Sequence, residues 1–126
     1  MDGLNKFIPL VSRILLGLIF VLAGAGKIAD PAGTAGYISS GGLPGTLLVW
    51  PTIALELLGG LAIIVGFKTR WVALALAAFC VVSGARYHNN FADQTQMIMF
   101  LKNLAMAGGF LQLYLHGAGK LAVDKA

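Results

Sequence analysis

The amino-acid sequence predicts an all-α fold, an integral membrane four-helix bundle in a single domain over residues 1–126. Three observations predict this class. Of the 126 residues, 58% are hydrophobic and only 11% are charged, whereas a soluble domain has about 25% charged residues. The mean hydropathy is +0.83. Four apolar runs also use most of the chain, since one membrane span takes about 20 residues.

The first membrane helix is expected at about residues 7–26. Its basic start at Lys6 and the Ala-Gly-Ala sequence at 23–25 resemble a cleavable signal peptide. Arg13 enters the apolar segment, however, and three comparable spans follow. We therefore interpret this segment as a retained membrane helix.

The connection after the first span is turn-rich and is the longest part of the chain outside the expected spans. It covers residues 27–44 and contains Asp30-Pro31 and several glycines. Such residues mark turns, and a short amphipathic helix is expected near residues 32–38.

The other three spans are expected at about residues 45–67, 70–87 and 95–116. A tight turn joins the second span to the third, and a polar loop joins the third to the fourth. None of the three shows the alternation of apolar and polar residues that is typical of a strand. Each is expected to be a helix, because backbone in hydrocarbon must satisfy its own hydrogen bonds.

Basic residues in the short connections predict the orientation. With four spans, one side of the membrane holds Lys6, Lys68, Arg70, Lys120 and Lys125, and the other holds Lys27 and Arg86. Because an excess of Lys and Arg favours the cytoplasmic side, we expect a multi-pass protein of the bacterial cytoplasmic (inner) membrane with both termini in the cytoplasm. The positive residues accompany hydrophobic segments, which indicates a membrane surface and no nucleic-acid partner.

Charged residues inside the spans are the candidate functional residues. Glu56 lies alone near the middle of the second span, Arg13 lies in the first, and Lys102 with Asn103 lies in the fourth. A charge at this depth costs roughly 2.5 to 3.5 kcal/mol, and such residues usually mark a site or pathway. At about 1.5 Å per residue, Arg13, Glu56 and Lys102 form a staircase with steps of about 6 Å. We therefore expect Glu56 to pair with Arg13, with Lys102 or with both.

Three uses of this cluster stay open. A closed ion network would lock helices together. The excess of two cations over one anion would attract a small anion or polarise a carbonyl group. Glu56 could also relay protons, because burial raises the pKa of a carboxyl group and nearby cations lower it.

A second polar group is expected at the outer mouth of the bundle. Lys27, Arg86 and His88 would form this outer vestibule, together with Tyr87 and Asp30. The single cysteine, Cys80, excludes an intrachain disulfide and a thiolate metal site, and it is expected to be a packing residue. No set of residues has the spacing of a metal site, so we expect none.

Short segments with a particular order and spacing extend over nearly the whole chain: Arg13, LGLIF at 16–20, Gly24, Lys27, Asp30-Pro31, GLP at 42–44, ELLGG at 56–60, GFKTR at 66–70 and FLKNL at 100–104. This order resembles the DoxX family of small bacterial membrane proteins. The resemblance implies a four-helix membrane domain in which Arg13, Lys27, Glu56, Lys102 and Asn103 belong to the family's polar pattern. Relatives of that family include the small subunit of thiosulfate:quinone oxidoreductases and members of redox or thiol-stress complexes.

The expected function is a quinone- or small-anion-binding accessory subunit in a redox or sulfur-related process. Arg13 or Lys102 would hydrogen-bond the ligand, and Glu56 would orient the cation or carry a proton. The chain has no cofactor motif, so a quinone or a redox partner protein would supply the electron chemistry; the lipid bilayer and a homo-oligomer are the other expected partners. A small transporter or channel subunit and a structural interaction module are the alternatives, and the sequence leaves open whether the chain is an enzyme.

Overall fold

The computed structural model describes residues 2–87, 92–119 and 121–124. In this part of the chain the regular structure is entirely helical, which confirms the all-α prediction. The helices are α1 (Asp2–Ala29), α2 (Pro31–Ser40), α3 (Gly45–Val65), α4 (Thr69–Tyr87) and α5 (Gln94–His116). Four of them, α1 over Asn5–Ala29 together with α3, α4 and α5, are long and apolar enough to cross a membrane.

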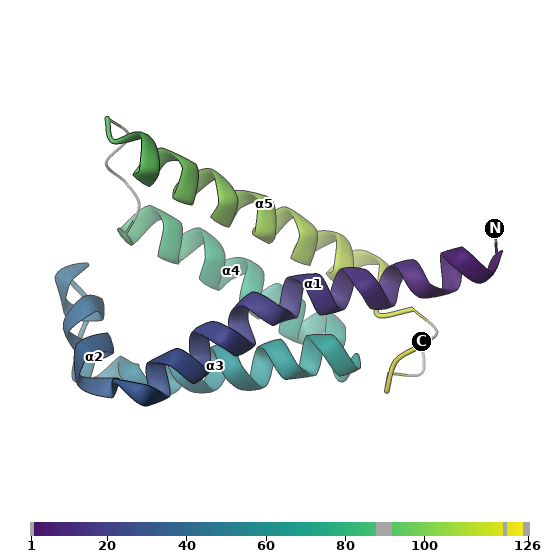
Figure 1. The fold of residues 1–126 in the computed structure, drawn as a ribbon, viewed down its shortest axis with the longest axis horizontal. Helices are drawn as coiled ribbons and strands as arrows, with labels where there is room; N and C mark the ends of the chain where they lie inside the picture. Colours follow the sequence, from purple (N-terminus) through teal and green to yellow (C-terminus); the bar gives the residue numbers. More distant parts are fainter. Residues whose placement is uncertain (1, 88–91, 120, 125–126) are drawn as a thin grey trace.

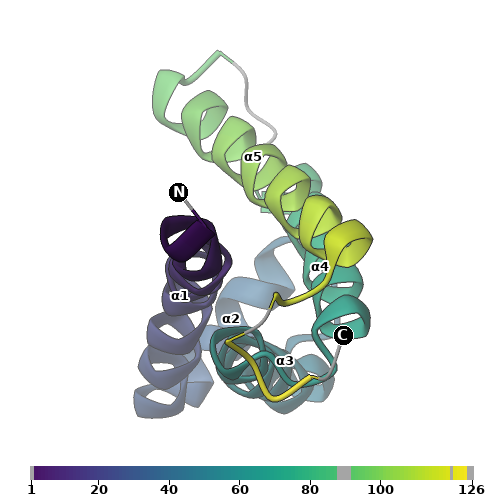
Figure 2. The ribbon, with the colours of Figure 1, turned by 90° about the vertical axis from the view of Figure 1, so that its right-hand side faces the viewer.

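The four long helices form two pairs. α1 packs along α3 and α4 packs along α5, while the two pairs meet mainly through α3 and α4 (Figures 1 and 2). At the centre, the Phe20 ring of α1 lies edge-on to two other rings, Phe79 of α4 and Phe110 of α5, with centroids 6.2 and 5.5 Å away. Cys80 is fully buried in the same core, as expected for a packing residue.

Glycines set the close approach of α1 and α3. A Cβ atom on Gly17 would lie 2.6 Å from the carbonyl oxygen of Gly60, and one on Gly24 would lie 2.9 Å from the backbone nitrogen of Leu57. Side chains at these positions would force the helices apart, so these glycines allow the two backbones to pack closely. Gly108 differs, because nothing lies within 4 Å of its Cβ position.

α2 is the expected short helix, and its ends are fixed by local chemistry. The Asp30 carboxylate accepts a hydrogen bond from the backbone nitrogen of Gly33 at 3.0 Å, and Pro31 begins the helix. Both features are typical of helix starts. At the other end, the Tyr87 hydroxyl donates to the carbonyl of Ile38 at 2.8 Å. α2 is therefore tied to α4 and lies across one end of the bundle (Figure 1).

The C-terminal segment folds back onto the opposite end of the bundle. The backbone nitrogens of Val123 and Asp124 donate to the carbonyls of Val65 and Gly66 at 3.0 and 2.7 Å. The Asp124 carboxylate accepts hydrogen bonds from the backbone nitrogens of Lys68 and Thr69 at 2.7 and 2.8 Å. This segment thus joins the end of α3 to the start of α4, and both chain ends lie at this end of the bundle (Figure 1).

Candidate ligand-binding site

Glu56 and Lys27 form an ion pair inside the bundle. The Lys27 ammonium nitrogen lies 2.7 Å from one oxygen of the Glu56 carboxylate and 2.8 Å from the other. Glu56 is only 3% exposed, whereas the Lys27 side chain is 27% exposed. The carboxylate is therefore compensated within the protein, and the ammonium group faces a less enclosed space.

The expected pairing of Glu56 with Arg13 or Lys102 is wrong, and the register of α1 and α3 gives the reason. Gly24 lies beside Leu57 and Gly17 beside Ile64. These contacts show which residues of the two helices lie side by side. If the same pairing continues to the end of α1, that end lies beside a point about two turns into α3. The first two turns of α3 thus project past α1, by about 10 Å at 1.5 Å per residue. The staircase assumed that both spans begin at the same level.

Lys27 reaches Glu56 because α1 is longer than expected. The helix continues to Ala29, so Lys27 lies in its last turn and not in the following connection. In the observed register this turn is about one helical turn from the level of Glu56, a distance that a lysine side chain spans.

Arg13 binds elsewhere, at the end of α3. Its guanidinium group is fully buried and donates to the carbonyl of Ile64 at 2.7 Å, to that of Ile63 at 3.4 Å and to that of Leu121. The last carbonyls of a helix carry partial negative charge and lack partners within the helix. Arg13 therefore compensates the end of α3 and holds the C-terminal segment against it.

Lys102 and Asn103 do not approach Glu56. α5 packs on α4, and within the described residues it makes no close packing with α3. Lys102 is exposed, and the Asn103 side chain donates to the carbonyl of Met99 in its own helix at 2.9 Å. The structure thus separates the expected cluster into three surroundings, with Glu56 next to Lys27, Arg13 at the end of α3 and Lys102 on the surface of α5.

A cavity of about 110 Å³ lies next to the ion pair, between α2 and the long helices, and it is partly open. Its wall is mostly apolar, with contributions from Phe79 and from aliphatic side chains of α2, α3 and α4. The side chains with polar groups are Lys27, Glu56, Thr52, Ser83, Tyr37 and Tyr87. A concave apolar site with a few converging polar groups is the usual form of a small-molecule site.

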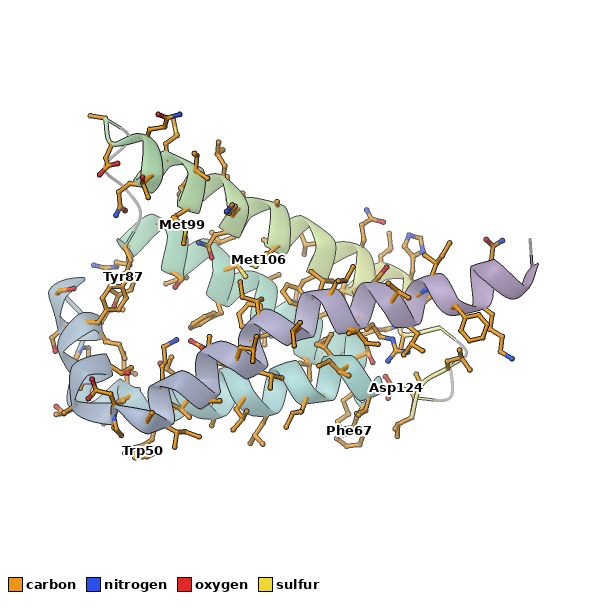
Figure 3. The ribbon with its side chains drawn as sticks, in the orientation of Figure 1. Trp50, Phe67, Tyr87, Met99, Met106 and Asp124 are labelled. Atoms are coloured by element: carbon orange, nitrogen blue, oxygen red, sulfur yellow. The ribbon has the colours of Figure 1, made fainter. Side chains whose placement is uncertain are left out.

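Two stacked tyrosines form one side of this cavity. The rings of Tyr37 and Tyr87 lie nearly parallel, with centroids 4.8 Å apart, and Figure 3 shows Tyr87 reaching from α4 toward α2. Burial, together with the neighbouring Tyr87, raises the pKa of Tyr37. Tyr37 therefore stays a neutral phenol at physiological pH and presents an apolar ring with a polar hydroxyl group.

The expected outer vestibule is formed only in part. Lys27 lines the cavity, and Arg86 lies at the same end, where it donates to the carbonyl of Gly41 at 3.2 Å. Arg86 therefore positions α2 and does not line the cavity. His88 lies outside the described residues.

Three of the polar residues around the cavity, Thr52, Ser83 and Tyr37, were not predicted from the sequence, whereas Tyr87 was expected at the outer mouth. Thr52 lies four residues before Glu56, and Ser83 lies four residues before Tyr87. Residues at this spacing share one face of a helix, so the periodicity could have indicated two polar faces. The participation of Tyr37 depends on how α2 folds back over the bundle, which no local pattern indicates.

The comparisons with known proteins agree with this architecture. The DoxX family model matches residues 8–89, a range that contains the ion pair and the whole cavity but not Lys102, Asn103 or the C-terminal segment. No solved structure matches the chain.

Three curated relatives share long stretches of sequence. The inner membrane protein YqjF of Escherichia coli (strain K12) is 45% identical over 116 residues, which covers 92% of this chain and 88% of the relative. The inner membrane protein YphA of the same organism is 32% identical over 123 residues, 92% of this chain and 87% of the relative. The putative oxidoreductase CatD of Bacillus subtilis (strain 168) is 34% identical over 68 residues, 54% of this chain and 50% of the relative.

The family match covers more than half of the chain, and two inner membrane proteins align with nearly all of it. The four apolar helices have the length and composition for multi-pass insertion. The chain is therefore a multi-pass protein of the bacterial inner membrane, and it belongs to the DoxX family.

Proposed function

We propose that this protein is a quinone-binding accessory subunit, and that the quinone ring binds in the cavity beside Lys27 and Glu56. The observation that carries the proposal is a mostly apolar cavity lined by a charged hydrogen-bond donor, the Lys27 ammonium group, which has one more N–H than its bonds to Glu56 use. An ammonium group has three N–H donors, and the Glu56 carboxylate accepts from Lys27 at two oxygens. The third N–H is available to a ligand.

The charge of the site favours a neutral ligand. The expected excess of two cations over one anion supported a small anion, but the observed pair has one charge of each sign. A sulfur oxyanion would meet the Glu56 carboxylate without a second cation to offset it. A quinone carbonyl needs only one donor and brings no charge, so it fits the Lys27 side of the pair.

The size of the cavity is also consistent with a single ring. A cavity of roughly 150 Å³ in another protein holds benzene, and the cavity here is about 110 Å³ and partly open. A six-membered ring would fill it, with its substituents emerging through the open side. The rings of Phe79 and Tyr87, both in the cavity wall, are available for contact with the faces of such a ring.

A bound quinone would accept two electrons from a partner redox protein and two protons from water, through the open side of the cavity, to become a quinol. Within this chain, Lys27 would hold a carbonyl oxygen of the ring, and Glu56 would orient the Lys27 ammonium group. The relative CatD is named a putative oxidoreductase, which supports a redox setting.

Binding of a short-chain benzoquinone to the protein in nanodiscs tests this proposal. We expect Lys27→Met to weaken binding by about tenfold or more, because a hydrogen bond to a charged group contributes roughly 1.5–3 kcal/mol. Lys102→Met is the matched control, since it removes an exposed lysine of a span that lies away from the cavity, and it should leave the affinity unchanged. Thiosulfate should not compete.

A second variant separates loss of binding from loss of folding. Lys27→Met combined with Glu56→Gln removes both charges, so no buried carboxylate is left unpaired. This double variant should fold and still bind the quinone weakly. Two results would contradict the proposed site: an unchanged quinone affinity in both Lys27 variants, or a loss of quinone affinity in Lys102→Met as large as that in Lys27→Met.

A further inference from the structure

A long apolar groove lies between α3 and α4 and runs toward the end that carries the C-terminal segment; neither Lys27 nor Glu56 lines it. Its volume is about 990 Å³. Small residues leave it hollow, namely Ala54, Gly59, Ala62 and Ala75. Near its end are two exposed aromatic side chains, Phe67 at 48% and Trp71 at 70%, and Figure 3 shows Phe67 pointing away from the helices.

A polar pocket adjoins this groove at the start of α4. It has a volume of about 350 Å³ and shares Lys68 and Trp71 with the groove. Arg70 and Asp124 also line it. The apolar groove therefore adjoins a group of charged side chains at the start of α4.

Among the residues that the structure describes, the positive charge of the polar pocket is not fully compensated. The Asp124 carboxylate is occupied by the backbone nitrogens of Lys68 and Thr69, and the Lys68 ammonium lies 5.8 Å from the centre of the Phe67 ring. Lys27 with Glu56 is the one pair of opposite charges in contact among the described residues. Lys68 and Arg70 thus give two cations against one carboxylate.

The length of the groove matches one leaflet of a bilayer. Its residues on α3 and the following turn extend from Ala54 to Phe67, about 20 Å at 1.5 Å per residue. Half of a hydrocarbon core of about 30 Å is about 15 Å. An acyl chain that enters beside Phe67 would therefore lie along the groove to the middle of the bilayer.

We infer that this surface is a binding site for an anionic phospholipid. Its phosphate would bind Lys68 and Arg70 in the polar pocket, and an acyl chain would occupy the groove between α3 and α4. Basic pockets next to membrane helices bind anionic headgroups in this way. Trp71, shared by the pocket and the groove, would lie at the level of the glycerol backbone, where tryptophan is common in membrane proteins. This site is independent of the proposed quinone site.

Tryptophan fluorescence tests the inference, because the chain has only two tryptophans. In Trp50→Phe, the remaining Trp71 reports on the groove; in Trp71→Phe, Trp50 reports on a site in α3 near its other end. The protein is reconstituted in phosphatidylcholine with increasing fractions of brominated phosphatidylglycerol or brominated phosphatidylcholine. Bromine quenches the fluorescence of a tryptophan in contact with the brominated chain.

We expect brominated phosphatidylglycerol to quench Trp71 at a several-fold lower fraction than brominated phosphatidylcholine. Lys68→Gln and Arg70→Gln together should abolish this preference, because both cations that favour an anionic headgroup are removed. Lys6→Gln removes a basic residue of α1 and should leave the preference intact, and Trp50 should show no preference.

Two results would overturn the inference. Equal quenching of Trp71 by both lipids would make the groove an ordinary lipid-facing surface. A preference that persists unchanged when Lys68→Gln and Arg70→Gln are combined would show that these two cations do not bind the lipid headgroup.

Discussion

At the scale of single residues, the Lys27–Glu56 pair explains how a carboxylate stays buried in a membrane protein. Removing a charge from water costs several kcal/mol, and a partner must offset that cost. Lys27 does so with both carboxylate oxygens in contact. The sequence indicated that Glu56 is buried next to a cation, and this is confirmed, although the cation is Lys27.

The burial of Glu56 was predictable from the sequence, but the identity of its partner was not. Arg13, Lys27 and Lys102 all have side chains long enough to meet a carboxylate, and the choice among them depends on helix register. The register follows from the contact of Gly17 with Gly60 and of Gly24 with Leu57. Such contacts between distant parts of the chain leave no mark in the local sequence pattern.

The pair predicts a specific pattern of stability. Lys27→Met should destabilise the protein by about 1–3 kcal/mol, less than for a fully enclosed pair because Lys27 is 27% exposed. Adding Glu56→Gln should recover most of the loss, since the unpaired carboxylate is then removed. Unfolding in detergent, measured for both single variants and the double variant, checks this, and additive losses would contradict the coupling.

At the scale of elements, the contact between α1 and α3 fixes the position of the ion pair. Gly17→Ala and Gly60→Ala should each destabilise the bundle by roughly 1–3 kcal/mol, because the added Cβ atoms would lie 2.6 and 2.8 Å from carbonyl oxygens of the facing helix. Gly108→Ala is the matched control, with nothing within 4 Å. Thermal unfolding in detergent compares the three, and equal midpoints would contradict the observed register.

The start of α4 depends on the C-terminal segment, and this dependence should vary with pH. Burial of Asp124 opposes its ionisation, but hydrogen bonds from Thr69 and Lys68 and the charge of Arg13 outweigh that effect and lower the pKa of Asp124. A lowered folded-state pKa means that the contribution to stability is complete above the ordinary pKa of 3.8. It is then lost as the pH falls through the lower value of the folded state.

Amide hydrogen exchange at Lys68 and Thr69 measures this effect. Protection, corrected for intrinsic exchange rates, should be constant from pH 7 to about pH 4 and should decrease below that range. Asp124→Asn should have weaker protection throughout and no such decrease. A decrease of equal size in Asp124→Asn would assign it to other groups.

The elements themselves were largely predictable. Composition and helical length indicate the membrane helices, and Asp30-Pro31 indicates the start of α2. The docking of residues 121–124 onto the bundle was not predictable, because a segment this short cannot show a repeating hydrophobic pattern. Their position depends on Arg13, which is fully buried beneath them. Arg13 binds both the end of α3 and this segment, and only the folded structure shows this role.

At the scale of the whole molecule, both chain ends lie at one end of the bundle and the cavity lies at the other (Figure 1). The transporter alternative expects a path linking Lys102, Glu56 and Arg13, and the described structure separates these side chains. The coexistence of an ion pair and a cavity gives more support to ligand binding than to a purely structural role.

The orientation of the molecule in the membrane stays a prediction. The end with Lys68 and Arg70 should face the cytoplasm, since it carries more basic residues. A C-terminal fusion to green fluorescent protein should fluoresce, and a C-terminal fusion to alkaline phosphatase should be inactive. An active phosphatase fusion would place the cavity on the cytoplasmic side instead.

The central claim is that the cavity beside Lys27 and Glu56 holds a quinone, and the most direct test is the ligand content of protein purified from native membrane. Mass spectrometry of extracted wild-type protein should detect a quinone in a defined ratio to the protein. Lys102→Met should retain this ratio, and Lys27→Met combined with Glu56→Gln should lower it, to about half or less of the wild-type value, as expected when affinity falls about tenfold and the wild-type site is no more than about nine-tenths occupied. A folded double variant that retains the wild-type quinone content, or a wild-type protein that carries none, would contradict the account.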